Sequence, residues 1–117
     1  MEKMKDGTLS IEINDADKVT MSWLGRSESR EPAVALNPYL TGLIDSISGK
    51  ELVVDFTKLE YMNSSTVPPI IQMIKNLNTK GVVTKIYYDK ESKWQAASFK
   101  ALETISKTMT SIEVTGK

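Results

Sequence analysis

Two adjacent serines, Ser64 and Ser65, are the residues of this chain best suited to carry chemistry. They precede a run with helical spacing, and a hydroxyl at a helix N-terminus is a favourable phosphate acceptor. The helix dipole and the free N–H groups there tolerate an added charge of roughly −1.5 to −2. The competing explanation is structural, because serine and asparagine at such a position commonly cap a helix, an effect of about 1 kcal/mol. Spacing alone leaves both roles open.

The amino-acid composition argues against most enzyme chemistry. The chain of 117 residues contains no cysteine and no histidine. Disulfides, thiolate metal sites, cysteine nucleophiles and Ser-His triads are therefore excluded, and the commonest zinc ligand is missing. The glycines are too scattered to form a phosphate-binding loop. We therefore expect a protein that is not an enzyme, with no catalytic residue, no metal site and no cofactor.

Charge and hydropathy indicate a soluble, cytoplasmic protein. The 15 basic and 15 acidic residues cancel, so no overall field attracts nucleic acid or a membrane surface. No segment approaches the roughly 20 apolar residues of a membrane span, and residues 1–10 lack the apolar core of a signal peptide. We expect residues 1–117 to form a single domain that binds no nucleic acid and does not insert into a membrane.

The chain begins with the pattern of an antiparallel hairpin. Apolar residues alternate with polar ones over 9–13 and again over 19–23, on either side of turn-forming residues at 14–17. A polar stretch, Gly25–Pro32, follows the second strand. It contains Arg30, whose guanidinium is suited to an anion or a partner's carboxylate, although a plain surface loop is the commoner role.

Three helices alternate with strands in the remainder of the chain. Pro38 is expected in the first turn of the first helix or to delay its start, and Ser92-x-x-Gln95 resembles a capping box for the third. Strands are predicted at 51–56, 82–88 and 111–115, and the continuous apolar run at 51–56 favours a central strand covered on both faces. The apolar stripes of the three helices are Leu36, Leu40, Leu43, Ile44 and Ile47; Val67, Ile70, Ile71, Ile74 and Leu77; and Trp94, Ala97, Ala101, Leu102 and Ile105.

The resulting order, β-β-α-β-α-β-α-β, predicts an α/β fold with a mixed sheet: an initial antiparallel hairpin, then β-α-β units with helices packed on the sheet. The loop between the 51–56 strand and the second helix should lie at the carboxyl edge of the sheet. Folds of this class commonly place their binding sites at that edge. The two serines therefore lie where a functional site is expected.

The segment from Leu52 to Ser65, LVVDFTKLEYMNSS, resembles the phosphorylation-site region of STAS domains, especially the bacterial anti-sigma-factor antagonists. In that family a central strand ends in Asp, and a Met-Asp-Ser-Ser/Thr-Gly segment opens the next helix. The order of strands and helices matches over nearly the whole chain, whereas close motif similarity is confined to this segment. The resemblance implies that residues 1–117 form a single STAS-like domain.

The resemblance also implies a partner-switching module in signal transduction and transcription regulation. A serine kinase of the histidine-kinase-like ATPase type, also acting as an anti-sigma factor, phosphorylates the antagonist, and a metal-dependent Ser/Thr phosphatase reverses this. The unmodified antagonist binds the kinase and frees a sigma factor. Carried over by position, Ser64 is the phosphorylation site, with Ser65 as second choice, and Asn63 takes the place of the preceding Asp. Asp55 matches the strand-terminal Asp, and Asp55, Asn63, Ser64, Ser65 and Thr66 form the expected partner-binding set.

Two departures from the family pattern, and two alternative functions, accompany this hypothesis. Asn63 replaces a carboxylate, and Thr66–Pro69 replaces a glycine-containing helix start. Each proline biases the preceding residue away from helical geometry, so we expect the second helix to begin late. One alternative is a constitutive, unphosphorylated scaffold of the same fold, in which Ser64 only caps a helix. The other is a small-ligand sensor with a pocket near Asp55, Ser64 and the Gly25–Pro32 loop.

Overall fold

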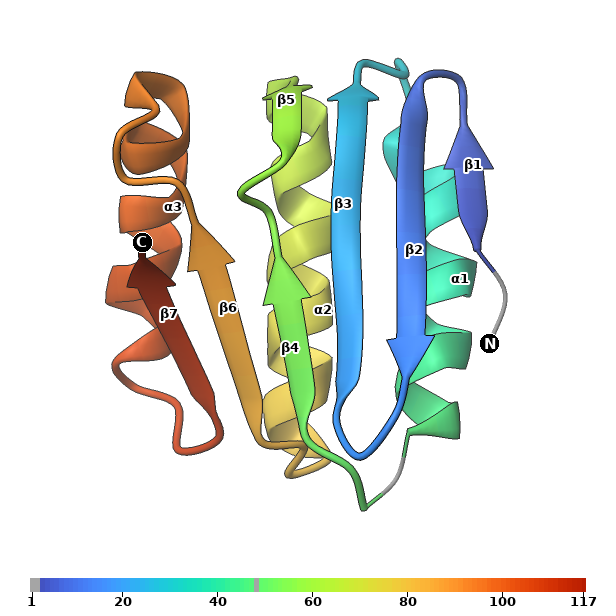
Figure 1. Ribbon diagram of the computed structural model, residues 1–117, viewed down its shortest axis with the longest axis vertical. Coiled ribbons are helices and arrows are strands. Elements are labelled where there is room, and N and C mark those ends of the chain that lie inside the picture. Colours follow the sequence, from blue (N-terminus) through green and yellow to red (C-terminus); the bar gives the residue numbers. More distant parts are fainter. Residues whose placement is uncertain (1–2, 48) are drawn as a thin grey trace.

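The computed structural model describes residues 3–47 and 49–117 (Figure 1). Over these residues the chain forms one mixed sheet, three α-helices and a short 3-10 helix, η1. The expected order of elements is present, with two additional short strands, β1 and β5. The elements are β1 (Met4–Asp6), β2 (Leu9–Asp15), β3 (Val19–Ser27), α1 (Pro32–Ser46), β4 (Leu52–Asp55), β5 (Leu59–Met62), η1 (Ser64–Thr66), α2 (Val67–Thr79), β6 (Thr84–Tyr88), α3 (Lys93–Ser106) and β7 (Ile112–Gly116).

The strands follow the order β1-β2-β3-β4-β6-β7 across the sheet, and β5 pairs with the end of β3. The β1–β2 and β2–β3 pairs are antiparallel, and the other pairs are parallel. Ile11 faces Trp23 across β2 and β3, which confirms the predicted hairpin. β4 lies between β3 and β6, which confirms the predicted central strand.

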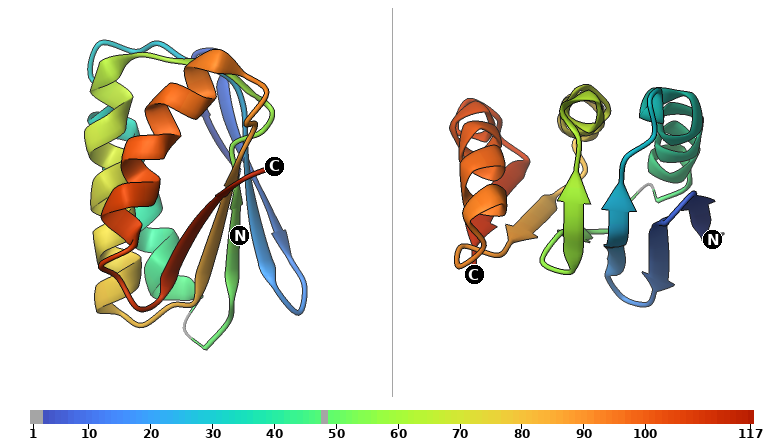
Figure 2. Two further views of the ribbon diagram at one scale, coloured as in Figure 1. Left: turned by 90° about the vertical axis from the view of Figure 1, so that its left-hand side faces the viewer. Right: turned by 90° about the horizontal axis from the view of Figure 1, so that it is seen from above.

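All three helices cover the same face of the sheet, as both views in Figure 2 show. From β3 the chain advances in one direction through β4, β6 and β7, with one helix in each crossover. Crossovers of one hand that advance in one direction leave their helices on one side of the sheet. The expectation that β4 is covered on both faces is therefore wrong. Leu52 and Val54 are buried beneath the helices, whereas Val53 and Asp55 are only half-buried.

The core lies between the covered face of the sheet and the helices. The ring centroid of Phe56 lies 4.9 Å from that of Trp23 and 4.7 Å from that of Phe99. Most of the predicted apolar stripes are confirmed as buried: Leu36, Leu40, Leu43 and Ile44 on α1, Ile70, Ile74 and Leu77 on α2, and Leu102 on α3. On α3, however, Ala97 and Ala101 are exposed, because the helix turns Phe99 inward instead.

β5 was not expected from the sequence, and its existence depends on a bend in β3. It pairs with the last residues of β3, where the register shifts between Gly25 and Arg26. Gly25 has a φ of 82°, and a Cβ at this position would lie 2.1 Å from the carbonyl oxygen of Thr8. Glycine therefore lets β3 pass the β1–β2 turn at close range and continue to β5.

Pro38 lies inside α1 rather than in its first turn. The helix begins at Pro32, which fills the first-turn position that a proline tolerates. A proline in the helix interior removes one backbone hydrogen bond, in this case to the carbonyl of Val34. Val34 and Pro38 are both exposed, so water can bind the carbonyl that has lost its partner.

Candidate functional site

The chain segment after β5 carries the two serines and lies at the carboxyl end of the parallel strands, at the top of Figure 1. The backbone N–H of Asn63 donates to the Ser27 carbonyl at 2.9 Å, which extends the β3–β5 pairing. η1 follows at once and leads into α2 at Val67. The expected late start of the second helix is wrong. Pro68 and Pro69 lie in the first turn of α2, where a missing N–H leaves no helical carbonyl unpaired.

The side-chain amide of Asn63 is hydrogen-bonded at both ends, once to the β3–α1 loop and once to Thr66 in its own segment. Nδ2 donates to the Ser29 carbonyl oxygen at 2.7 Å, and Oδ1 accepts from the Thr66 hydroxyl at 2.7 Å. Ser27 Oγ lies 2.7 Å from Thr66 Oγ1. Because the Thr66 proton is used on Asn63, Ser27 is the donor in this last contact. These four residues form a directed chain of hydrogen bonds, the Asn63 bracket, between the β3–α1 loop and the start of α2.

The Asn63 bracket is partly inside the protein. Ser27 is 2% exposed and Thr66 is 0% exposed. Buried hydroxyls that are all hydrogen-bonded hold their loops firmly, because each broken bond leaves a polar group without a partner. Thr66, which the sequence predicted to be a partner-binding residue, is buried, and its hydroxyl bonds to Asn63 and Ser27. Its part in binding a partner stays a prediction.

Ser64 and Ser65 are both exposed to solvent on the outside of this bracket. Within residues 3–47 and 49–117, neither hydroxyl takes part in a hydrogen bond. The residues at the starts of η1 and α2 also make no side-chain cap hydrogen bond. The explanation of Ser64 as a helix cap is therefore wrong for this conformation. Both hydroxyls are left available to another molecule.

Asp55 does not join the serines. Its Oδ1 accepts hydrogen bonds from the backbone N–H and the hydroxyl of Thr57, at 2.8 and 2.6 Å. This turn begins the connection from β4 to β5. Along β4, Asp55 alternates with the buried Leu52 and Val54, so its side chain belongs to the uncovered face of the sheet. Its place is therefore beside the turn that leads to β5.

Gln95 is a site residue that sequence reasoning missed. Only half of the expected capping box forms: Ser92 Oγ accepts from the Gln95 N–H at 3.5 Å. The Gln95 side chain turns inward instead, and Nε2 donates to the carbonyls of Phe56 and Leu59, both at 2.9 Å. Its Oε1 accepts from the Asp89 N–H at 2.8 Å. Gln95 is 1% exposed and ties α3 to the β4–β5 turn that delivers the serines.

The sequence did contain a signal for this role of Gln95. Gln95 precedes the buried Phe99 by four residues and the buried Leu102 by seven, so it shares their helical stripe. A glutamine on a buried stripe requires hydrogen-bond partners, because burying an unpaired amide costs free energy. Because the sequence prediction placed Ala97 and Ala101 on the buried stripe, Gln95 was not recognised as a buried residue.

The chain's two arginines lie in and beside the β3–α1 loop and differ in their contacts. Arg26 Nε lies 3.2 Å from Glu28 Oε2, and the Arg26 guanidinium carbon lies 4.7 Å from the ring centroid of Tyr61. Arg30 is exposed and forms no ion pair with any residue that the structure describes. The loop therefore presents one occupied and one available guanidinium.

A hollow of about 410 Å³ adjoins the same loop, and it is lined by Asp6, Ser29, Arg30, Glu31, Val34 and Ala35. The ligand-sensor hypothesis placed a pocket near the Gly25–Pro32 loop, Asp55 and Ser64. The hollow does lie at that loop. Neither Asp55 nor Ser64 lines it, so the structure does not bring the three parts of that hypothesis together in this hollow.

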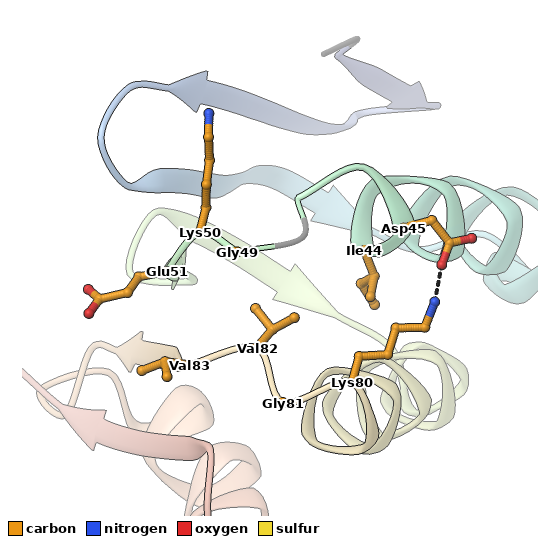
Figure 3. A pocket seen from close by; sticks show the side chains of 9 residues that line it. All are labelled: Ile44, Asp45, Gly49, Lys50, Glu51, Lys80, Gly81, Val82 and Val83. Atoms are coloured by element: carbon orange, nitrogen blue, oxygen red, sulfur yellow. Dashed lines mark hydrogen bonds and ion pairs between the residues drawn. The ribbon is translucent and has the colours of Figure 1, made fainter.

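A second hollow, of about 340 Å³, lies at the opposite end of the parallel strands and is shown in Figure 3. An ion pair between Asp45 and Lys80 connects the ends of α1 and α2 at its edge. Lys50 and Glu51 point away from this pair in Figure 3. They form ion pairs of their own, Lys50 with Asp15 at 2.6 Å and Glu51 with Lys18 at 3.7 Å. The charged side chains lining this hollow are thus all paired.

Metal binding and membrane spanning find no support in the described part of the chain. No cluster of Asp and Glu there is suited to a metal ion. None of the described helices combines the length and the apolarity needed to cross a membrane. The candidate site consists of the Ser64 and Ser65 hydroxyls, the Asn63 bracket and the Arg30 guanidinium.

Comparison with known proteins finds solved structures with a similar fold. No family model and no curated protein sequence matches the chain. An anti-sigma factor antagonist from Mycobacterium paratuberculosis has a similar structure, with a TM-score of 0.63 and 14% identity over 90% of this chain and 85% of that one. The anti-sigma factor antagonist SpoIIAA in its unphosphorylated form gives a TM-score of 0.57 and 15% identity over 86% of this chain and 96% of that one.

A third solved structure is an uncharacterized protein of the DUF3478 family with a SpoIIAA-like fold, from Shewanella loihica PV-4. It gives a TM-score of 0.58 and 12% identity over 97% of this chain and 90% of that one. These likenesses confirm the α/β fold that the sequence predicted. The chain has the fold of these structures, with the mixed sheet and one-sided helices described above.

Proposed function

We propose that the protein is a non-enzymatic signalling module, an anti-sigma-factor antagonist that acts by partner switching through Ser64. In its unmodified form it binds a serine kinase of the histidine-kinase-like ATPase type, which also serves as the anti-sigma factor. Phosphorylation of Ser64 ends this binding, and a Ser/Thr phosphatase restores it. Because the switch consumes ATP, the proposal places the protein in the cytoplasm. Its fold likeness to two anti-sigma factor antagonists supports this choice.

The observation that carries the proposal is the contrast between Ser64 and its surroundings. The Ser64 hydroxyl is exposed and has no hydrogen bond within the described residues. The residues that hold the segment, Asn63 and Thr66, are tied to the β3–α1 loop by contacts of 2.7 Å. A free hydroxyl on a fixed backbone is well suited to a kinase, which needs its acceptor oxygen in line with the transferred phosphorus.

Phosphorylation of Ser64 is a substitution at the γ-phosphorus of ATP. The Ser64 oxygen forms a bond to the γ-phosphorus of ATP while the bond from that phosphorus to the ADP oxygen breaks. The hydroxyl proton passes to a base of the kinase, so Ser64 needs no base of its own. The phosphatase returns the serine by adding water across the same oxygen–phosphorus bond. Neither step requires a catalytic residue in this chain.

Exposed side chains at this end of the sheet can supply contacts for a partner. Ser65 follows Ser64, Tyr61 on β5 is 38% exposed, and Val34, which lines the hollow at the β3–α1 loop, is 70% exposed. Exposed apolar and aromatic side chains near one loop are typical of interaction surfaces. Asn63 borders this surface directly, whereas we assign Asp55 and Thr66 indirect parts as residues that shape its turns.

The direct test is modification by a cognate kinase. Incubating the protein with the kinase and ATP should add the mass of one phosphate, and the addition should be lost in Ser64→Ala. Ser65→Ala is the matched control, because Ser65 is also exposed and its hydroxyl has no hydrogen bond to the residues that the structure describes. Retention of the phosphate in Ser64→Ala and its loss in Ser65→Ala would move the switch to Ser65. Absence of any modification would overturn the switching mechanism.

A constitutive scaffold of the same fold is distinguished by Ser64→Asp. Under partner switching the added charge should weaken kinase binding by at least tenfold, whereas a constitutive scaffold should bind unchanged. The Ser64 side chain has no hydrogen bond to the described residues, so the variant should fold with a stability within about 0.5 kcal/mol of wild type. Isothermal titration of both proteins, after a thermal melt, makes the comparison.

A further inference from the structure

Arg30 lies in the loop that the Asn63 bracket ties to the proposed switch. Its side chain is exposed and forms no ion pair with the residues that the structure describes. Arg26 differs, because its guanidinium is already engaged by Glu28 at 3.2 Å and by the ring of Tyr61 at 4.7 Å. Of the two arginines in the chain, Arg30 is therefore the one available to a new anion.

The Asn63 bracket joins the two segments that carry Arg30 and Ser64. Its bond of 2.7 Å from Asn63 Nδ2 to the Ser29 carbonyl joins the two residues that immediately precede Ser64 and Arg30. Consecutive Cα atoms lie about 3.8 Å apart, so the backbones at 30 and 64 are only a few bonds from this contact. A long arginine side chain can span such a separation. The buried contact between Ser27 and Thr66 is a second link between the same two segments.

Phosphorylation would supply the anion that Arg30 lacks. A phosphoserine carries a charge of roughly −1.5 to −2 and three acceptor oxygens, and the planar guanidinium binds two such oxygens at once. We propose that phosphorylated Ser64 is bound by Arg30 of the same chain, which clamps the β3–α1 loop onto the start of α2. The inference rests on the proposed function, because it concerns the same serine. Phosphorylation then withdraws both the Ser64 hydroxyl and the Arg30 charge from the partner.

The clamp is tested on the full chain with phosphoserine incorporated at position 64 during translation, so that no kinase is needed. A phosphorus NMR titration measures the second ionisation of the phosphate, whose pKa is ordinarily about 6. A nearby guanidinium favours the dianion, so we expect that pKa to fall by roughly half a unit or more, equivalent to about threefold weaker proton binding. Melting of the phosphorylated protein should also occur at a higher temperature than melting of its Arg30→Gln variant.

Three variants of the phosphorylated protein separate the possible causes. Arg30→Gln should return the phosphate pKa to its ordinary value. Arg30→Lys should retain part of the shift, because lysine keeps the charge but loses the two-pronged geometry. Arg26→Gln should leave the shift unchanged, because Arg26 is already bound to Glu28 and Tyr61. Both arginines are exposed, and melts of the unphosphorylated variants verify that each one folds.

Two results would overturn the clamp: an equal phosphate pKa in the Arg30 and Arg30→Gln proteins, or a shift that Arg26→Gln removes. Either result leaves phosphorylation by a kinase intact, because the phosphoserine was placed without one. Conversely, a kinase that never modifies Ser64 would defeat the proposed function while the measured phosphate pKa still reports on Arg30. The two failures are therefore distinguishable.

Discussion

The two ends of the sheet carry hollows of similar size but are stabilised by different interactions. At the Ser64 end, neutral side chains form short hydrogen bonds, and Ser27, Thr66 and Gln95 are buried. At the other end, the charged pairs Asp45–Lys80, Lys50–Asp15 and Lys18–Glu51 lie in solvent. Among the described residues, the first end leaves two serine hydroxyls and one guanidinium without partners, whereas the second pairs every charge that lines its hollow.

This difference separates two ends that the size of their hollows does not distinguish. Exposed ion pairs contribute little to stability, because water and salt screen them and long side chains lose freedom in forming them. Buried neutral hydrogen bonds are costly to break, since each loss leaves a polar group without water or a partner. The Ser64 end therefore combines a rigid frame with available groups. That combination is what a recognition site requires.

The comparison is tested most severely by Gln95→Leu, for which we expect the largest loss of stability. Leucine has a similar volume but leaves the carbonyls of Phe56 and Leu59 and the N–H of Asp89 without this partner. The Phe56 carbonyl keeps the Leu59 N–H at 3.0 Å, so the other two groups, at about 1–3 kcal/mol each, give a loss of about 2–6 kcal/mol. Chemical denaturation measures it directly.

Gln72→Leu is the matched control for Gln95→Leu. Gln72 is an exposed glutamine on α2, so its replacement should change the unfolding free energy by less than about 0.5 kcal/mol. Equal effects of the two substitutions would contradict the assignment of Gln95 as a buried anchor of the β4–β5 turn.

Asn63→Asp tests the bracket itself and should have a smaller effect. The carboxylate can still accept from the Thr66 hydroxyl, but it cannot donate to the Ser29 carbonyl, so a partly buried acceptor faces another acceptor. We expect a loss of about 1–3 kcal/mol in unfolding free energy at neutral pH. The protonated acid regains a donor, so the folded-state pKa of this new Asp should be raised. The deficit should therefore shrink as the pH falls through that value.

Asn37→Asp provides the control for charge alone. Asn37 is an exposed asparagine on α1, so the same change there should cost little and should not follow the same pH dependence. A deficit at position 63 that persists at acidic pH would show that the donor to Ser29 is not what the bracket requires. The expected result would also account for the departure from the family pattern, because the amide at 63 has a donor function in this chain.

The sequence was sufficient for the architecture because long periodic patterns determine it. Alternation over 9–13 and 19–23 and helical spacing over 67–77 are each repeated several times, so single exceptions do not change the assignment. The short strands were missed because β5 has only four residues, and its pairing depends on the bend at Gly25. Such pairing is a tertiary contact that no local pattern encodes.

The site was only partly predictable for the same reason. Local spacing identified Ser64 and Ser65 as hydroxyls near a helix start, but it could not decide whether they cap that helix. The structure decided this, because Asn63 and Thr66 bond to residues 27 and 29, more than thirty positions earlier. Pro68 and Pro69 led to the wrong prediction of a late start for α2. A proline disfavours helical geometry in the residue before it, but in the first turn of a helix a proline is tolerated.

The smallest expected effect belongs to the opposite end of the sheet, where Asp45→Asn removes the ion pair with Lys80. Both side chains are about half exposed, at 55% and 45%, so the pair is well screened. We expect a loss of about 0–1 kcal/mol that diminishes further as salt is raised. Denaturation at low and high ionic strength measures both quantities. A loss comparable to that of Gln95→Leu, or one unaffected by salt, would mean that the charged end is as firmly held as the Ser64 end. The two ends would then not differ in how firmly they are held, and the contrast between buried neutral hydrogen bonds and screened ion pairs would fail.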